Sequence, residues 1–188
     1  MVATVDGPGA HPGAAAGRVT RLVRESDAER LAELLVANRE FLAPTAPDRP
    51  ASYATVEGQR ALVATRLAEY REGTRLPLVV LDDGGEVVGQ ITLNEIVRGP
   101  SQSANVGYWL SEHVGGRGLA TAALREVVQV AFDELGLHRL QAGTLLDNVR
   151  SQRVLLKVGF TVIGDAPAYL HIAGRWADHR LFQLVDDR

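Results

Sequence analysis

The chain has 188 residues, of which 46% are hydrophobic and 23% are charged, and its formal net charge is −3. These values suit one globular domain with a full hydrophobic core, and they exclude a chain that is disordered throughout. The absence of cysteine excludes disulfides, thiolate metal sites and a cysteine nucleophile, and the lack of a basic excess argues against direct nucleic-acid binding.

The hydropathy pattern gives no sign of a membrane segment or a secretory signal. No apolar run approaches the roughly 20 residues of a membrane helix. The N-terminus lacks a basic start followed by an apolar run. We therefore expect a soluble cytoplasmic protein.

The N-terminal part of the chain shows three successive patterns. Residues 1–17 are rich in Gly, Ala and Pro without periodicity, which predicts a flexible tail before a single domain over residues 18–188. The alternating segment Val19–Val23 predicts a first strand. Ser26 and Glu29 have the spacing of a capping box, which predicts that the first helix begins there.

The middle of the chain is expected to form a helix and an antiparallel meander. Apolar residues at helical spacing predict the helix over Ala54–Glu72. The apolar segments Leu76–Leu81 and Glu86–Ile96 flank Asp82–Gly85, whose Asp-Asp-Gly-Gly sequence favours a hairpin turn. A third strand is expected over Ala104–Leu110.

The hydrophobic period changes after this meander. Helical spacing predicts a long helix over Arg117–Leu135, with Gly136 as its C-cap. A strand over Arg139–Leu145, a helix over Val149–Val158, and strands over Phe160–Ile163 and Arg180–Val185 are expected to follow. Antiparallel strands followed by alternating helices and strands indicate an α/β fold with a mixed sheet covered by helices.

A glycine-rich turn joins the third strand of the meander to the long helix. Gly115, Gly116 and Gly118 fall within four positions, and small residues, among them Ala120 and Thr121, follow in the helix. Without Cβ atoms the backbone N–H groups can approach a bulky anion, and the positive end of the helix dipole attracts it. The segment therefore predicts a pyrophosphate cradle.

Two other kinds of phosphate-binding loop, and a structural turn without a ligand, are the alternatives for this segment. A nucleoside-triphosphate loop requires a Lys after the last glycine, but Leu119 follows Gly118. A dinucleotide fingerprint belongs to the first unit of a parallel sheet, whereas this turn follows an antiparallel meander. A glycine-rich helix start without a ligand is the structural alternative.

Three separated motifs resemble those of the GNAT superfamily of acyl-CoA-dependent N-acyltransferases, and within it the RimJ/RimL type that acetylates protein N-termini. Gly116–Ala120 is similar to the acyl-CoA motif Q/R-x-x-G-x-G/A, although Gly115 replaces the usual Gln or Arg. Val106–Leu110 is similar to the Gly-Tyr-Trp strand of the family. Residues Asn148–Phe160 are similar to the pattern N-x-x-S-x-x-x-x-x-K-x-G-F.

The resemblance implies a V-shaped mixed sheet that holds acetyl-CoA, as cosubstrate, between two splayed strands, and it implies no metal. Backbone groups of Tyr108, Trp109 and Leu110 would pair with the pantetheine arm. Asn148 would hydrogen-bond to the arm, although an N-cap is the common structural role of Asn. The pyrophosphate would lie on the turn and the first helical residues, which are Gly115, Gly116, Arg117, Gly118, Leu119, Ala120 and Thr121.

The implied chemistry is direct attack of an amine on the thioester, without a covalent enzyme intermediate. Ser151 matches the residue that would protonate the leaving thiolate, and a position in the first turn of a helix is its structural alternative. An α-amine has a pKa of about 8 and needs only a modest base. Glu95 on the central strand is the first candidate for this base, followed by Glu112 and His113.

The substrate side of the expected site has two walls, formed by residues 41–53 and residues 165–179. The chain is expected to be an N-acetyltransferase whose acceptor is a primary amine, with a protein N-terminal α-amine as first candidate. A small-molecule amine or another acyl group is one alternative. A catalytically weak acyl-CoA sensor is another, because Gly143 and Ala168 replace carboxylates that family members carry. No membrane or direct nucleic-acid partner is expected, and a homodimer is left open.

Overall fold

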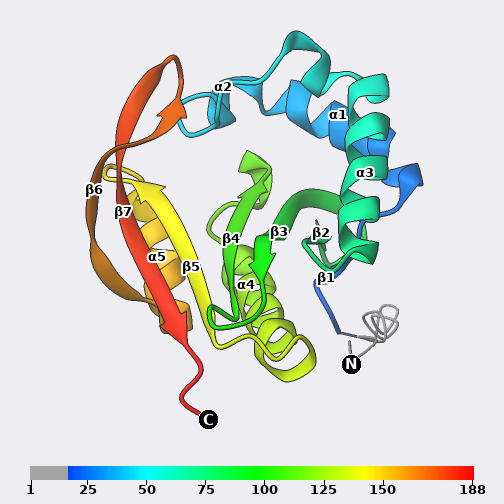
Figure 1. Ribbon diagram of the computed structural model, residues 1–188. Coiled ribbons are helices and arrows are strands. Elements are labelled where there is room, and N and C mark those ends of the chain that lie inside the picture. The colour runs from blue at the N-terminus through cyan, green and yellow to red at the C-terminus, as the bar shows by residue number, and fades with distance from the viewer. Residues whose placement is uncertain (1–16) are drawn as a thin grey trace.

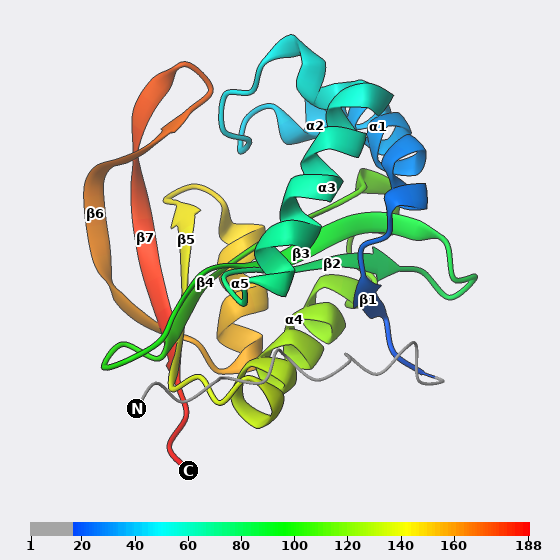
Figure 2. The same cartoon turned by 45° about the vertical axis from the view of Figure 1, so that its right-hand side comes forward.

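A seven-stranded mixed sheet forms the centre of the fold, in the order β1-β2-β3-β4-β5-β7-β6. The structure, a computed structural model, describes residues 17–188, so the expected tail lies outside the described residues except for Gly17. Helices cover both faces of the sheet (Figures 1 and 2). The predicted fold class, a mixed α/β sheet flanked by helices, is confirmed.

The elements follow one another along the chain largely as predicted. The strands are β1 (Thr20–Leu22), β2 (Leu76–Leu81), β3 (Val87–Val97), β4 (Ser103–Leu110), β5 (Arg139–Leu145), β6 (Thr161–Ile172) and β7 (Arg175–Val185). The helices are α1 (Ala28–Ala37), α2 (Arg39–Leu42), α3 (Val56–Arg71), α4 (Leu119–Gln129) and α5 (Val149–Val158). Over residues 17–188, no helix combines the length and hydrophobicity needed to cross a bilayer.

Capping residues and glycines determine where several helices begin and end. The Thr55 hydroxyl accepts a hydrogen bond from the Gly58 N–H at the start of α3, at 3.0 Å. Asn148 accepts one from the Ser151 N–H at the start of α5, at 3.1 Å. Gly159, with φ 104°, ends α5 in the left-handed conformation. Such local hydrogen bonds explain why these boundaries could be predicted from the sequence.

The first helix begins differently from the prediction. Ser26 lies in a 3-10 turn, and α1 begins after Asp27. The Asp27 carboxylate accepts hydrogen bonds from the Arg24 N–H at 2.8 Å and from the Arg21 guanidinium at 2.7 Å. The predicted capping box of Ser26 and Glu29 is therefore wrong, because the buried Asp27 carboxylate satisfies the backbone donor instead.

The long helix reaches its predicted end, but it changes from α-helical to π-helical before that end. The α-helical part, α4, stops at Gln129, and a single π-helical turn follows over Val130–Glu134. In this turn the Leu135 N–H donates to the Val130 carbonyl, at 2.9 Å. Gly136, the predicted C-cap, does adopt a left-handed φ of 59° after the turn.

The C-terminal hairpin is much longer than predicted. β6 runs on to Ile172 and β7 begins at Arg175, so most of the loop expected over residues 165–179 is paired strand. The pairing shifts between Val162 and Gly164 and again between Ala166 and Leu170. Because these bulges break the alternation of polar and apolar residues, the sequence pattern does not reveal the strands.

Two hydrophobic clusters lie on opposite faces of the sheet. The larger one joins the sheet to α4 and α5 and includes Leu124 and Leu155, both fully buried. The smaller one joins the sheet to α1 and α3 and includes Leu31. Successive residues of a strand face opposite sides, so Tyr108 packs against the larger cluster and Trp109 against the smaller one. Tyr108 and Trp109 therefore contribute to different sides of any site at β4.

Candidate active site

The site is built around a fork between the parallel strands β4 and β5. The two strands pair at their beginnings, and the last register pair joins Asn105 to Gln141. β4 then continues to pair with β3 up to Leu110, and β5 with β7 up to Leu145. The two strands therefore separate, which confirms the predicted V shape; Figure 1 shows β4 and β5 diverging.

The inner edges of the fork fit an extended ligand. Beyond the last pair, β4 and β5 share no ladder among the described residues, although each is paired on its outer side. Backbone N–H and C=O groups within a sheet require partners. A pantetheine arm carries amides that can add to such an edge as a strand does. Tyr108, Trp109 and Leu110, the predicted partners, lie on the β4 side of the fork.

Two glycines open the fork on the face that carries α1 and α3. Gly107 on β4 and Gly143 on β5 each lie two residues beyond the last pair, Asn105 with Gln141, and both are exposed. A Cβ at Gly107 would approach only the amide nitrogen of Asn94, at 3.6 Å. The missing side chains leave room for a reacting group between the strands.

The turn after β4 has the geometry of an anion cradle. Gly116 and Gly118 have φ values of 78° and 81°, and a Cβ at either would meet nothing within 4 Å. Gly118 is the N-cap of α4, and no side chain caps the helix there. The N–H of Ala122 donates to the Gly118 carbonyl, so the N–H groups before it have no helical acceptor. Donors of this kind at a helix start suit a pyrophosphate.

The other residues predicted for the cradle lie where expected along the chain. Gly115 follows a short 3-10 turn over Glu112–Val114, and its φ of −62° and ψ of 146° together give an extended backbone. A Cβ there would lie 3.0 Å from the Glu112 carbonyl oxygen, a tight contact for the Gln or Arg of the family motif. Arg117 is exposed and precedes the helix, and Leu119, Ala120 and Thr121 form its first turn.

Ser151 and Tyr108 are brought together across the face that carries α5. The Tyr108 hydroxyl lies 2.8 Å from the Ser151 hydroxyl. Burial raises the pKa of Tyr108 to about 12, so its phenol stays protonated at neutral pH. Asn148 caps α5 through its side-chain oxygen and leaves its amide N–H groups available to a ligand. The Asn148 cap also holds the backbone of Ser151 in place.

Glu95 lies apart from this pair, at the closed end of the fork. It occupies a bulge of β3 with a left-handed φ of 51°, and its exposed carboxylate accepts a hydrogen bond from Asn105 at 2.6 Å. Three strand positions, about 10 Å, separate Asn105 from Tyr108. Glu112 and His113, the further candidates, are exposed beside the cradle.

His179 lies beside the fork, although it is not among the site residues predicted from the sequence. His179 on β7 is 3% exposed, and its Nδ1 lies 2.9 Å from the Ala177 carbonyl oxygen. Its ring is 3.6 Å from where a Cβ of Gly143 would lie, and the Tyr169 ring packs against it. Among the described residues its Nε2 has no hydrogen-bond partner. In the sequence, the only indication of a role for His179 was its position at the end of the segment 165–179, which was predicted to border the substrate.

The two predicted substrate walls touch each other over the fork. Asp48 pairs with Nδ1 of His171 at 2.8 Å and accepts the Gly174 N–H at 3.1 Å. Figure 1 shows the α2 region reaching the tip of the β6–β7 hairpin. A cavity of about 270 Å³ lies between the segment after α2 and the start of α5. It is lined by Pro44, Thr45, Asp147, Asn148, Val149 and Arg150. Trp176, whose ring packs against that of His171, is 65% exposed.

Comparisons with known proteins agree with this geometry. Residues 19–161 match the model of an acetyltransferase (GNAT) domain. The [ribosomal protein uS5]-alanine N-acetyltransferase of Escherichia coli is 32% identical, over 89% of this chain and 87% of its own. The ribosomal-protein-S5-alanine acetyltransferase of Vibrio fischeri has a TM-score of 0.86 and 31% identity, covering 89% of this chain and 92% of its own. Mycobacterium smegmatis RimJ, in complex with CoA-disulfide, has a TM-score of 0.86 and 33% identity, covering 89% of this chain and 81% of its own.

Proposed function

Because the chain belongs to the GNAT acetyltransferase family and is an acyl-CoA-dependent N-acyltransferase, we propose that it acetylates the α-amine of a protein N-terminus. The observation that carries this proposal is the full-length similarity to acetyltransferases named for a ribosomal-protein alanine. The proposal includes a cytoplasmic location, where such substrates are made. It involves no metal.

Acetyl-CoA supplies the activated acyl group, and this chain would hold it at three places. The unpaired edge of β4 at Tyr108, Trp109 and Leu110 would pair with the pantetheine amides. The N–H groups of the Gly116–Thr121 segment would receive the pyrophosphate. The side-chain amide of Asn148, whose oxygen is engaged as a cap, would donate to the arm.

Proton delivery to the leaving sulfur is assigned to the Tyr108–Ser151 pair. In the proposed reaction the amine nitrogen bonds to the thioester carbon, the carbon–sulfur bond breaks, and the sulfur takes a proton. Ser151 can donate its hydroxyl proton to the sulfur while it takes the Tyr108 phenol proton across their 2.8 Å hydrogen bond, and Tyr108 then regains a proton from solvent. An alkyl thiol has a pKa of about 8.5, so the help required is small. A β4 backbone N–H can stabilise the developing oxyanion.

For the proton lost by the amine, His179 is the better-placed base. Its free Nε2 belongs to a ring beside Gly143, where the fork is open. The fixed Nδ1 holds the imidazole in one orientation, as a base requires. Glu95 is the competing candidate, but its carboxylate is engaged by Asn105 at the closed end of the fork.

The proposed function is tested with the full chain, acetyl-CoA and synthetic peptides. Thiol release and peptide mass spectrometry should show one acetyl group on the N-terminal amine of peptides that begin like ribosomal proteins. Blocking that amine should abolish the transfer. Transfer only to small amines would support the small-molecule alternative. Tight acetyl-CoA binding without thiol release on a broad amine panel would support the sensor alternative instead.

A further inference from the structure

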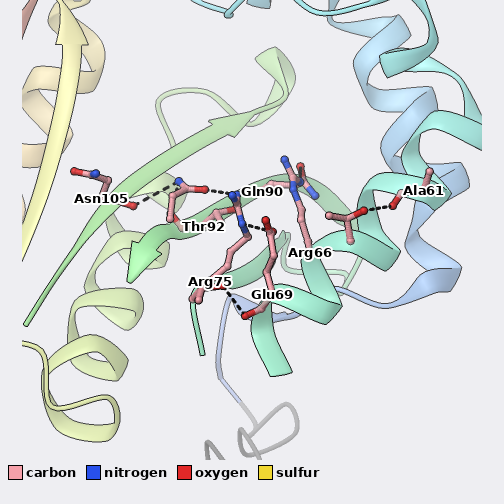
Figure 3. Close-up of polar contacts among 10 residues, drawn as sticks. Ala61, Arg66, Glu69, Arg75, Gln90, Thr92 and Asn105 are labelled. Carbon is pink, nitrogen blue, oxygen red and sulfur yellow. Dashed lines mark hydrogen bonds and ion pairs between the residues drawn. The ribbon is translucent and has the colours of Figure 1, made fainter. Parts of the chain in front are cut away.

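The helix α3 places a positive charge, without a matching carboxylate, beside the open fork. α3 crosses the sheet over β3, yet only Gln59 and Val63 of its residues are buried. Arg66 extends from α3 toward Gln90 on β3, and Figure 3 shows the two side chains in the layer between helix and sheet. The N–H of Arg66 donates to the Gln90 side-chain oxygen at 3.0 Å. Beside the hydrophobic contacts of Val63 and Leu67, α3 therefore makes a polar contact with the sheet through Arg66.

Arg66 is held in place but its charge is not balanced. Gln90 is 4% exposed, and its oxygen also accepts the Trp109 indole N–H at 3.3 Å. The Nε of Arg66 is buried without a partner. Among residues 17–188 no carboxylate reaches ion-pairing distance of Arg66, whereas the neighbouring Arg75 pairs with Glu69 at 2.6 Å.

A second arginine stands beside it. The Arg49 guanidinium lies 5.1 Å from the centre of the Tyr53 ring, and Tyr53 adjoins Arg66. Arg49, which is exposed, also has no carboxylate partner within the described part of the chain. Burial lowers the pKa of Arg66, and the Tyr53 phenol offsets this only in part. Arg66 is half-buried, and a partly desolvated cation is stabilised by an anionic partner. The two arginines can therefore bind an anionic group at this place.

The position of Arg66 in the fold indicates which ligand would carry the anionic group. Gln90 is in register with Trp109 on β4, and Gly107 lies two residues from Trp109 on the same face, about 7 Å along the strand. The cradle belongs to α4, which packs on the opposite face together with Tyr108. The phosphates of CoA therefore lie away from Arg66, and the amine substrate lies near it.

We propose that Arg66, with Arg49 and Tyr53, binds a carboxylate of the amine substrate and so selects acceptors that carry an acidic group close to the reacting amine. The inference rests on the proposed function. In a peptide the carboxylate is a Glu or Asp side chain in the first residues. In a free amino acid it is the α-carboxylate. The guanidinium binds either in the same way, because its planar N–H groups match two oxygens.

The test compares peptides that differ only in charge. With the wild-type chain, kcat/KM is measured for N-terminal peptides that carry Glu or Gln at the second or third position, and for amino acids and their amides. We expect a preference of about tenfold or more for the Glu peptide, expressed in KM and reduced by salt. A matching preference for amino acids over their amides would assign the free α-carboxylate as the natural group. Equal rates for the charged and neutral members of both series would overturn the subsite.

Variants then show which arginine causes the preference for the Glu peptide over the Gln peptide. Arg66→Gln should bring the Glu-to-Gln ratio to about one, whereas Arg60→Gln, on the exposed side of α3, should leave the ratio as in the wild type. If Arg66→Gln does not fold, the exposed Arg49→Gln should reduce the ratio about threefold. A preserved ratio in both Arg66→Gln and Arg49→Gln overturns the assignment. Transfer to no amine at all would refute the proposed function, whereas transfer without charge preference refutes only the subsite.

Discussion

The Tyr108 hydroxyl lies 2.8 Å from the Ser151 hydroxyl and so joins β4 to the first turn of α5. The two residues are 43 positions apart in the chain. Asn148 orders the same turn through the Ser151 N–H. One arm of the fork and the adjacent helix therefore carry a hydroxyl pair at the place proposed for the leaving sulfur.

If the two hydroxyls act as one proton-delivery unit, their loss is not additive. We expect Ser151→Ala and Tyr108→Phe each to lower kcat by about tenfold or less, because a thiolate is a tolerable leaving group. The double variant should be little worse than the more affected single variant. Thiol release at saturating acetyl-CoA measures all three. Losses that simply multiply would show that the hydroxyls act separately.

The raised pKa of Tyr108 predicts a loss of stability in alkali. The unfolded phenol ionises around pH 10, but burial holds the folded value at about 12. Its contribution is therefore complete below pH 10 and is lost as the pH rises toward 12, by about 1.4 kcal/mol per pH unit. Urea unfolding at pH 9 and pH 11 should show the wild type losing about 1 kcal/mol more than Tyr108→Phe. An equal loss in both proteins would contradict this.

Gly118 and Gly85 offer a matched pair of left-handed glycines. Their φ values are 81° and 82°, and a Cβ at either would meet nothing within 4 Å. Alanine at either position should cost about 1 kcal/mol of stability through backbone strain. Only Gly118→Ala should weaken acetyl-CoA binding, by about tenfold or more, because the new methyl group enters the cradle. Calorimetric titration decides, and equal affinity in both variants would contradict the cradle.

Asn148 has two separable roles. Asp retains the cap oxygen that Ser151 uses but lacks the amide N–H, whereas Ala lacks both. Asn148→Asp should keep the thermal stability of the wild type, and Asn148→Ala should lose about 1 kcal/mol. Both should bind acetyl-CoA more weakly. If Asn148→Asp binds acetyl-CoA as tightly as the wild type, Asn148 is a helix cap only.

His179 and Glu95 compete as the base, and their amide variants distinguish them. His179→Asn can still donate to the Ala177 carbonyl but has no basic nitrogen. We expect it to lower kcat by about 10²-fold, because no other group of the side chain can take the amine proton. Glu95→Gln should lower kcat less than threefold. Circular dichroism and acetyl-CoA affinity serve as the folding control, and the reverse ranking would assign the base to Glu95.

Local patterns in the sequence were enough for much of this protein. The hairpin at Asp82–Gly85, the helix capped by Asn148 and the cradle at Gly116–Gly118 rest on backbone conformations and hydrogen bonds between residues close in the chain. For that reason the glycine turn and the mixed sheet could be inferred from the residues before the fold was known, whereas the acyl-CoA chemistry followed from the family resemblance of the three motifs. The first helix start failed because the buried Asp27 carboxylate, held by Arg21, took over the cap.

Only the tertiary structure decided which side chains meet at the fork. The extended β6–β7 hairpin brings His179 beside Gly143, and the packing of α3 places Arg66 over Gln90. Neither contact leaves a periodic signal, because each joins residues that are distant in sequence and depends on strand register and helix packing. The acyl-CoA motifs therefore consist of residues that are close together in the sequence, whereas the proposed selection of the amine depends on contacts between residues far apart.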